Sequence, residues 1–181
     1  MDVQSVYQRA IVFATRKHVE KNQTVPGTHL PYVVHLSNVA MEILVAAPHS
    51  PELKVEVAVQ IALLHDTLED TDTTLEELTQ LFGTEIAEGV AALTKNEAVP
   101  KIDRMKDSLH RIKQQPKEVW AVKLADRITN LQKPPAYWES DKRKEYQKEA
   151  QIILEELKGG NAYLEHRLKE KIVGYGNFIV G

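Results

Sequence analysis

The stretch Leu63-Leu64-His65-Asp66-Thr67-Leu68-Glu69-Asp70-Thr71 joins an apolar segment to a cluster of ionisable side chains. The segment that leads into it, residues 55–64, is apolar on almost every side. Its β-branched residues would also suit a strand, but no partner strand is evident elsewhere in the chain, so we expect a helix. A helix that is apolar all round belongs in the middle of a bundle. The stretch therefore predicts an all-α fold with this helix at its centre.

Apolar residues at helical spacing predict further helices on both sides of this segment. Prolines and glycines, such as those at 26–27 and 134–135, mark the breaks between them. Residues suited to cap a helix stand before four of the later helices: Thr74 (which forms a capping box with Glu77), Thr84, Ser140 and Asn161. We expect one domain over residues 1–181, a compact bundle of about eight to nine helices.

Composition excludes several classes of protein. The 181 residues carry a formal net charge of −3, whereas nucleic-acid-binding domains show a basic excess, so we expect no nucleic-acid partner. No apolar run approaches the roughly 20 residues of a membrane span, so we expect no membrane partner. The N-terminus lacks the pattern of a secretory signal, which predicts a cytoplasmic location. Because the chain has no cysteine, any metal must be held by histidine nitrogens and carboxylate oxygens.

Ionisable residues interrupt apolar surroundings at three separate places. His35 and Asp126 each stand among aliphatic neighbours on a predicted helix, and His65-Asp66 ends the central one. Each residue alone has an ordinary interpretation as a hydrogen-bonded core residue. Buried charges on three core-facing helices need partners, however, and one divalent cation would serve all of them. We therefore predict a metal site built by His35, His65, Asp66 and Asp126.

The donor set and its acidic neighbours indicate the chemistry. Two imidazoles and two carboxylates suit Mn²⁺, Fe²⁺ or Zn²⁺, with positions left open for water and substrate. Such an ion lowers the pKa of bound water and polarises a phosphoryl oxygen. Glu69 and Asp70 then stand where they can orient or deprotonate that water. Taken alone, an acidic cluster is more often a solvated helix end, so the site hypothesis depends on the core positions.

Three segments of the chain, in order, resemble the HD-domain superfamily of metal-dependent phosphohydrolases. The histidine and aspartate pattern of the predicted metal site is similar to the H…HD…D signature of that superfamily. The resemblance is closer to the RelA/SpoT-type hydrolase domains, and especially to the stand-alone small alarmone hydrolases. The segments that carry it are Pro31–His35, Leu63–Thr71 and Lys123–Leu131.

The resemblance implies a Mn²⁺-dependent enzyme of the stringent response. It would remove the 3′-pyrophosphate from (p)ppGpp, an alarmone nucleotide, and yield GDP or GTP and pyrophosphate. His35, His65, Asp66 and Asp126 would be the metal ligands, and Glu69 and Asp70 would activate the water. The implied substrate contacts are Asn130 and Tyr146 for the nucleotide, and Lys101 and Lys142 for its phosphates.

The loop of residues 21–29 departs from the pattern of these relatives. They usually carry a basic pair there, near the base and phosphates, whereas this loop reads KNQTVPGTH. Without arginine its bidentate reach is lost, so the preferred base stays open. The alternative function is an HD-domain phosphatase acting on another nucleotide, an adenine alarmone or NADPH. A nucleotide sensor without turnover is a third hypothesis, and the oligomeric state also stays open.

Overall fold

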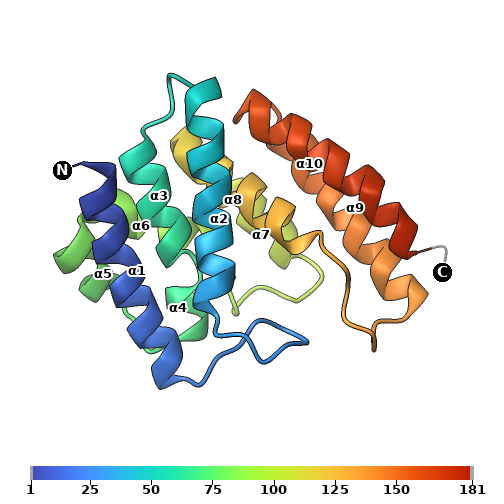
Figure 1. Cartoon of the computed structure of the whole chain (residues 1–181), viewed down its shortest axis with the longest axis horizontal. Helices are drawn as coiled ribbons and strands as arrows, with labels where there is room; N and C mark the ends of the chain where they lie inside the picture. Colours follow the sequence, from blue (N-terminus) through green and yellow to red (C-terminus); the bar gives the residue numbers. More distant parts are fainter. Residues whose placement is uncertain (1, 180–181) are drawn as a thin grey trace.

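The computed structural model describes residues 2–179, which form an all-α structure (Figure 1). These residues contain no strand, only an isolated bridge between Thr24 and Pro31. The helices in chain order are α1 (Val3–Glu20), α2 (Val33–Ala46), α3 (Val55–Leu64), α4 (Thr67–Asp70), α5 (Leu75–Phe82), α6 (Thr84–Leu93), α7 (Arg104–Lys113), α8 (Lys117–Asn130), α9 (Ser140–Glu156) and α10 (Ala162–Tyr175), with 3-10 turns at Ala47–His49 and Gly176–Phe178. Since α4 is a single turn, nine longer helices lie in the described range, which confirms the predicted bundle.

The central helix is α3, as the apolar segment predicts. Six of its ten residues are buried, and it packs against α1, α2, α6 and α8. Gly89 lets α6 approach closely, because a Cβ at that position would meet Ile61 Cδ1 at 2.7 Å. Burying one leucine or isoleucine stabilises a fold by about 1.5–3 kcal/mol. The packing of α3 therefore fixes the point in the bundle at which its C-terminal end delivers His65.

The last two helices, α9 and α10, run antiparallel along one side of the bundle (Figure 1). α10 packs against both α8 and α9. Arg167 of α10 donates hydrogen bonds of 2.7 and 2.6 Å to the two carboxylate oxygens of Glu42, a buried residue of α2. This bidentate pair ties the C-terminal helices to the helix that carries His35.

Two of the four predicted caps are confirmed and two are wrong. The Thr74 hydroxyl accepts a 3.1 Å hydrogen bond from the Glu77 amide, and Asn161 caps α10. The Glu77 carboxylate pairs with Lys17, however, so the predicted capping box is only half formed. Thr84 is instead the first residue of α6, because Gly83, at φ +88°, is the single residue between α5 and α6 and caps both helices. Ser140 is the first residue of α9, whose N-cap residue makes no side-chain hydrogen bond.

No helix in the described part of the chain is long and apolar enough to cross a bilayer. The single domain over residues 1–181 and the cytoplasmic location stay predictions from the sequence.

Candidate metal centre

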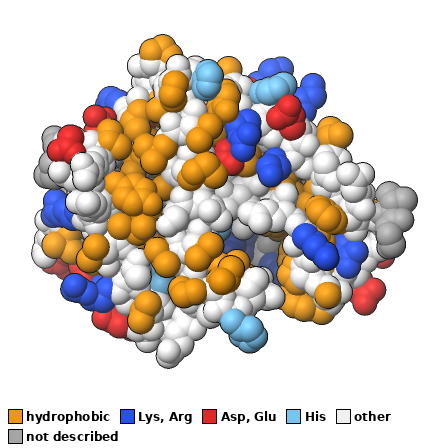
Figure 2. Space-filling model, in the orientation of Figure 1, with side chains coloured by type: hydrophobic (Ala, Val, Ile, Leu, Met, Phe, Trp, Pro, Cys, Tyr) orange, Lys and Arg blue, Asp and Glu red, His pale blue; other side chains and the backbone are white. Residues whose placement is uncertain are grey.

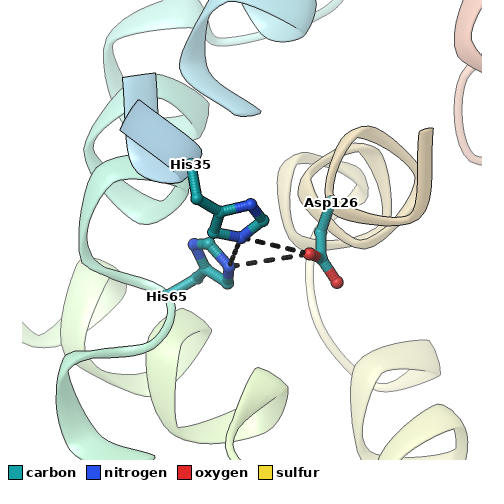
Figure 3. Close-up of side chains that lie close together, drawn as sticks. All are labelled: His35, His65 and Asp126. Atoms are coloured by element: carbon teal, nitrogen blue, oxygen red, sulfur yellow. Dashed lines mark hydrogen bonds and ion pairs between the residues drawn. The ribbon is translucent and has the colours of Figure 1, made fainter. Parts of the chain in front are cut away.

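Three core helices bring His35, His65 and Asp126 together (Figure 3). His35 lies in the first turn of α2, His65 directly follows α3, and Asp126 lies in α8. All three are buried, with exposed fractions of 7, 5 and 8 %. One ligand atom from each lies within 4.8 Å of the other two. Residues separated by as many as 91 positions therefore meet at one point inside the bundle.

The separations between these atoms are close to those of a coordination sphere. His35 Nε2 lies 3.3 Å from His65 Nε2 and 3.5 Å from Asp126 Oδ1, and His65 Nε2 lies 3.8 Å from the same oxygen. Two atoms bound to one cation at about 2.1 Å lie about 3.0–3.4 Å apart. A small contraction therefore suffices to place a divalent cation between the three helices.

The imidazole of His65 is held in the orientation that a metal ligand needs. Its Nδ1–H donates a 2.8 Å hydrogen bond to the carbonyl of Ala62, in the last turn of α3. This bond fixes the ring and leaves Nε2 facing His35 and Asp126. The end of α3, where carbonyls lack helical partners, supplies this acceptor.

Asp66 is turned toward the same point by the break between α3 and α4. Its Oδ2 lies 2.9 Å from His65 Nε2 and 3.6 Å from His35 Nε2, and it accepts a 2.5 Å hydrogen bond from the Tyr32 hydroxyl. Asp66 is not part of the group defined by mutual distances under 4.8 Å. Of the four predicted ligands, three thus form the cluster, and the fourth contacts both of its histidines.

The Asp126 carboxylate is anchored by residues one turn away on α8. Asn130 Nδ2 donates to Oδ1 at 2.6 Å, and Lys123 Nζ donates to Oδ2 at 3.2 Å. These two bonds fix the carboxylate plane in front of the histidines. Asn130, a predicted nucleotide contact, therefore makes its side-chain hydrogen bond to a predicted metal ligand.

The ionisable groups of the cluster shift one another's pKa values. Burial opposes a charge on His65, but the carboxylates of Asp66 and Asp126 outweigh burial and raise the pKa of His65 to about 9. Burial would likewise raise the pKa of Asp66, yet the His65 charge and hydrogen bond hold it well below its usual range. The pKa of Asp126 is also low, because Lys123 and the two histidines outweigh its burial. Protons and a divalent cation therefore compete for the same ligand atoms.

The two predicted catalytic acids lie on the single turn α4 and have different partners. Lys95 binds both oxygens of Glu69, through Nζ to Oε1 and through its backbone amide to Oε2 at 3.1 Å. Asp70 Oδ2 accepts a 2.7 Å hydrogen bond from Gln23 Nε2. Burial is the main cause of the raised pKa of Asp70, and the charges of Asp66 and Glu69 add to it. A raised pKa makes a carboxylate a better proton acceptor.

Tyr146 lies on α9 and contacts the residue that follows Asp126. The Arg127 guanidinium lies over the Tyr146 ring, 4.4 Å from its centroid, and Trp138 meets the ring edge-on at 5.0 Å. Burial raises the pKa of Tyr146 to about 12, so its hydroxyl stays protonated as a hydrogen-bond donor. In the same orientation as Figure 1, Figure 2 shows a hollow near the middle of the molecule, with Lys or Arg side chains at its floor.

The two predicted phosphate contacts are exposed lysines. Lys142 donates a 2.9 Å hydrogen bond to Glu145, and the pKa of Glu145 is lowered by Lys142 first and then by the charge of Lys101. Lys101, which precedes α7, therefore lies on the same side of the molecule as this part of α9. Among residues 2–179, no hydrogen bond or ion pair joins either lysine to the metal cluster.

Three neighbours of the site were missed as functional residues by sequence reasoning. They are Tyr32, which donates to Asp66, Lys95, which binds Glu69, and Gln23, which binds Asp70. Gln23 and Lys95 lie in loops, 47 and 26 positions from their partners, where periodicity carries no signal. Tyr32 had a signal, since it belongs to the Pro31–His35 segment.

Comparison with known proteins identifies the family. Residues 10–160 match the HD domain. The chain belongs to the HD-domain family. This membership, like the buried cluster, implies dependence on a divalent cation, and it confirms the predicted family and fold.

Relatives named for an enzymatic activity cover nearly the whole chain. Guanosine-3′,5′-bis(diphosphate) 3′-pyrophosphohydrolase MESH1 of Danio rerio is 33 % identical over 177 residues, 95 % of each chain. The Homo sapiens protein of that name is 36 % identical over 162 residues, 87 % of each chain. A solved structure described as a metazoan ortholog of SpoT that hydrolyzes ppGpp superposes with a TM-score of 0.81 at 28 % identity, covering 94 % of this chain and 96 % of that one. This HD domain thus resembles proteins of similar length.

Proposed function

We propose that this protein is a Mn²⁺-dependent enzyme that removes the 3′-pyrophosphate from ppGpp-type nucleotides, giving GDP or GTP and pyrophosphate. The observation that carries the proposal is the convergence of His35, His65 and Asp126 from three core helices. The substrate class is supported by relatives of similar length named as 3′-pyrophosphohydrolases.

The residues present fit a divalent cation. Two imidazole nitrogens and a carboxylate oxygen are the donor types that suit Mn²⁺, and the His65 tautomer fits a role as ligand. His35, His65, Asp66 and Asp126 would hold the ion, with Tyr32 orienting Asp66. When bound there, the cation supplies Lewis acidity, which lowers the pKa of water and polarises a phosphoryl oxygen.

The chain's own residues would carry the proton and the substrate. Water attacks the phosphorus attached to the ribose 3′ oxygen, the new P–O bond forms, and the bond from that phosphorus to the 3′ oxygen breaks. Glu69 and Asp70 would orient the water and accept its proton, and that proton would then pass to the 3′ oxygen, which leaves as a hydroxyl. Asn130 and Tyr146 would contact the nucleotide.

Lys101 and Lys142 would contact the phosphates. Both are exposed and lie on the same side of the molecule, so they add a diffuse positive field for a polyanionic substrate.

A second substrate class is favoured by the loop of residues 21–29. It carries no arginine, and its Gln23 is already bound to Asp70. This loop therefore offers the base no bidentate arginine contact. An HD-domain phosphatase acting on an adenine alarmone or NADPH is the alternative.

A substrate panel tests both candidates. Purified protein with Mn²⁺ should release pyrophosphate from ppGpp, and full metal occupancy without turnover would refute the proposed activity. Orthophosphate released from NADPH, with no pyrophosphate from ppGpp, would establish the alternative instead.

A further inference from the structure

The two acids of α4 differ in how many of their carboxylate oxygens accept hydrogen bonds. Both oxygens of Glu69 accept hydrogen bonds from Lys95. Asp70 is bound through Oδ2 alone, by Gln23 Nε2 at 2.7 Å, and no residue within 2–179 donates to its Oδ1. Asp70 therefore keeps a whole oxygen for a further donor, whereas the Glu69 carboxylate is occupied by a salt bridge. This difference singles out Asp70 as the acid that meets the attacking water.

Gln23 is itself held on both sides. The Nδ1–H of His18 donates to Gln23 Oε1, so the amide must turn its Nε2 toward Asp70. The Gln23 backbone donates to the His18 carbonyl at 3.1 Å and accepts from the Tyr32 amide at 3.3 Å. Because the backbone and the side-chain oxygen of Gln23 are both held, its Nε2 can donate in only one direction, toward Asp70.

His18 is built into the site rather than lying on the surface. Its side chain is buried, at 1 % exposed, and its ring stacks on that of Tyr32 at 4.7 Å. The same Tyr32 donates to Asp66. His18, near the end of α1, is thus connected to Asp66 through Tyr32 and to Asp70 through Gln23.

We propose that Gln23, oriented by His18, is a positioning residue that sets the rotation of the Asp70 carboxylate and presents Oδ1 to the attacking water. The inference rests on the proposed hydrolase function. A hydrogen bond to a carboxylate is charge-assisted and directional, so it stabilises one rotamer of a group that Asp66 and Glu69 repel. Catalytic groups misplaced by a fraction of an ångström lose much of their effect.

The test is steady-state kinetics on the full chain with Mn²⁺ and ppGpp. We expect Gln23→Ala to lower kcat by roughly ten- to a hundredfold. We expect KM and Mn²⁺ affinity to stay within about twofold, because positioning of the base acts on the chemical step. Gln23→Met keeps the length of the side chain and removes both polar atoms, so it serves if the alanine variant folds poorly. Gln80→Ala, which removes a glutamine bonded to Glu76 on exposed α5, is the matched control.

A double-mutant cycle separates positioning from a general structural role. If Gln23 acts through Asp70, Gln23→Ala should have little further effect in an Asp70→Ala background. An equal loss in both backgrounds, a loss confined to KM, or unchanged kcat would overturn the inference. An inactive wild-type protein would instead refute the proposed function, and this inference with it.

Discussion

The metal cluster and the substrate side of the site are built on different kinds of structure. His35, His65 and Asp126 project from core helices and are buried, whereas Lys101 and Lys142 are exposed. The cluster is held by hydrogen bonds to Ala62, Lys123 and Asn130. Lys142 pairs with Glu145 and lies 6.0 Å from the centroid of the Trp138 ring. The proposed chemistry would thus depend on the core of the bundle, while the proposed phosphate contacts lie on residues that can change without disturbing that core.

The largest effect is expected in the cluster. His65→Ala or Asp126→Ala should lower turnover by at least about a thousandfold, because loss of a ligand removes several kcal/mol of transition-state stabilisation. Pyrophosphate release and Mn²⁺ binding should fall together. His166→Ala, which removes an exposed histidine of α10, should leave both unchanged. Full activity in either ligand variant would show that the cluster is structural.

The acids of α4 come next. Asp70→Asn should lower kcat by about 10²–10⁴-fold, since it removes the proton acceptor that meets the attacking water. Glu69→Gln should lower kcat by less, since Lys95 already binds both Glu69 oxygens. Mn²⁺ binding should persist, because neither residue belongs to the buried cluster. Calorimetry with Mn²⁺ beside the kinetic assay checks this. Undiminished turnover in both variants would rule out a proton-accepting role for the pair, and a sensor would show no turnover even in the wild type.

A smaller effect is expected from the loss of the Tyr32 hydroxyl, which supports Asp66. Tyr32→Phe removes the hydroxyl that donates to Asp66 and keeps the ring that stacks on His18. Loss of such a partner costs about 10–100-fold in metal affinity or activity. The variant should need more Mn²⁺ for half-maximal activity. An unchanged Mn²⁺ titration would mean that Asp66 needs no orientation by Tyr32.

The smallest effects belong to the exposed lysines. Lys101→Ala and Lys142→Ala should each raise KM by no more than about fivefold and leave kcat nearly unchanged, since exposed charge pairs contribute up to about 1 kcal/mol. The difference from wild type should shrink at high salt as charges are screened. A large loss of kcat in either variant would place that lysine at the reacting phosphorus instead.

The same contrast explains what could be predicted from the sequence. Charged residues in apolar helices are conspicuous, so His35, His65 and Asp126 could be assigned to one point from the pattern alone. The helical state of 55–64 followed from the absence of a partner strand, and the fold class from that segment. The contact between Asp66 and Tyr32 required the break after α3, which a helical pattern does not reveal.

The loop residues of the site could not be predicted from the sequence, for a physical reason. Gln23 and Lys95 have no periodic neighbours, and tertiary packing alone selects their partners on α4. The wrong cap at Thr84 has a similar origin, since Gly83 at φ +88° caps both α5 and α6 and leaves Thr84 as the first helical residue. Local preference was overridden there by the path of the chain.

The most direct test of the account is a crystal structure of the full chain with Mn²⁺, with the ion located by its anomalous scattering. We predict a single strong peak bound by His35 Nε2, His65 Nε2 and Asp126 Oδ1, with an Asp66 oxygen completing the protein ligands at about 2.0–2.2 Å. A peak bound elsewhere, or none between α2, α3 and α8 at saturating Mn²⁺, would contradict it.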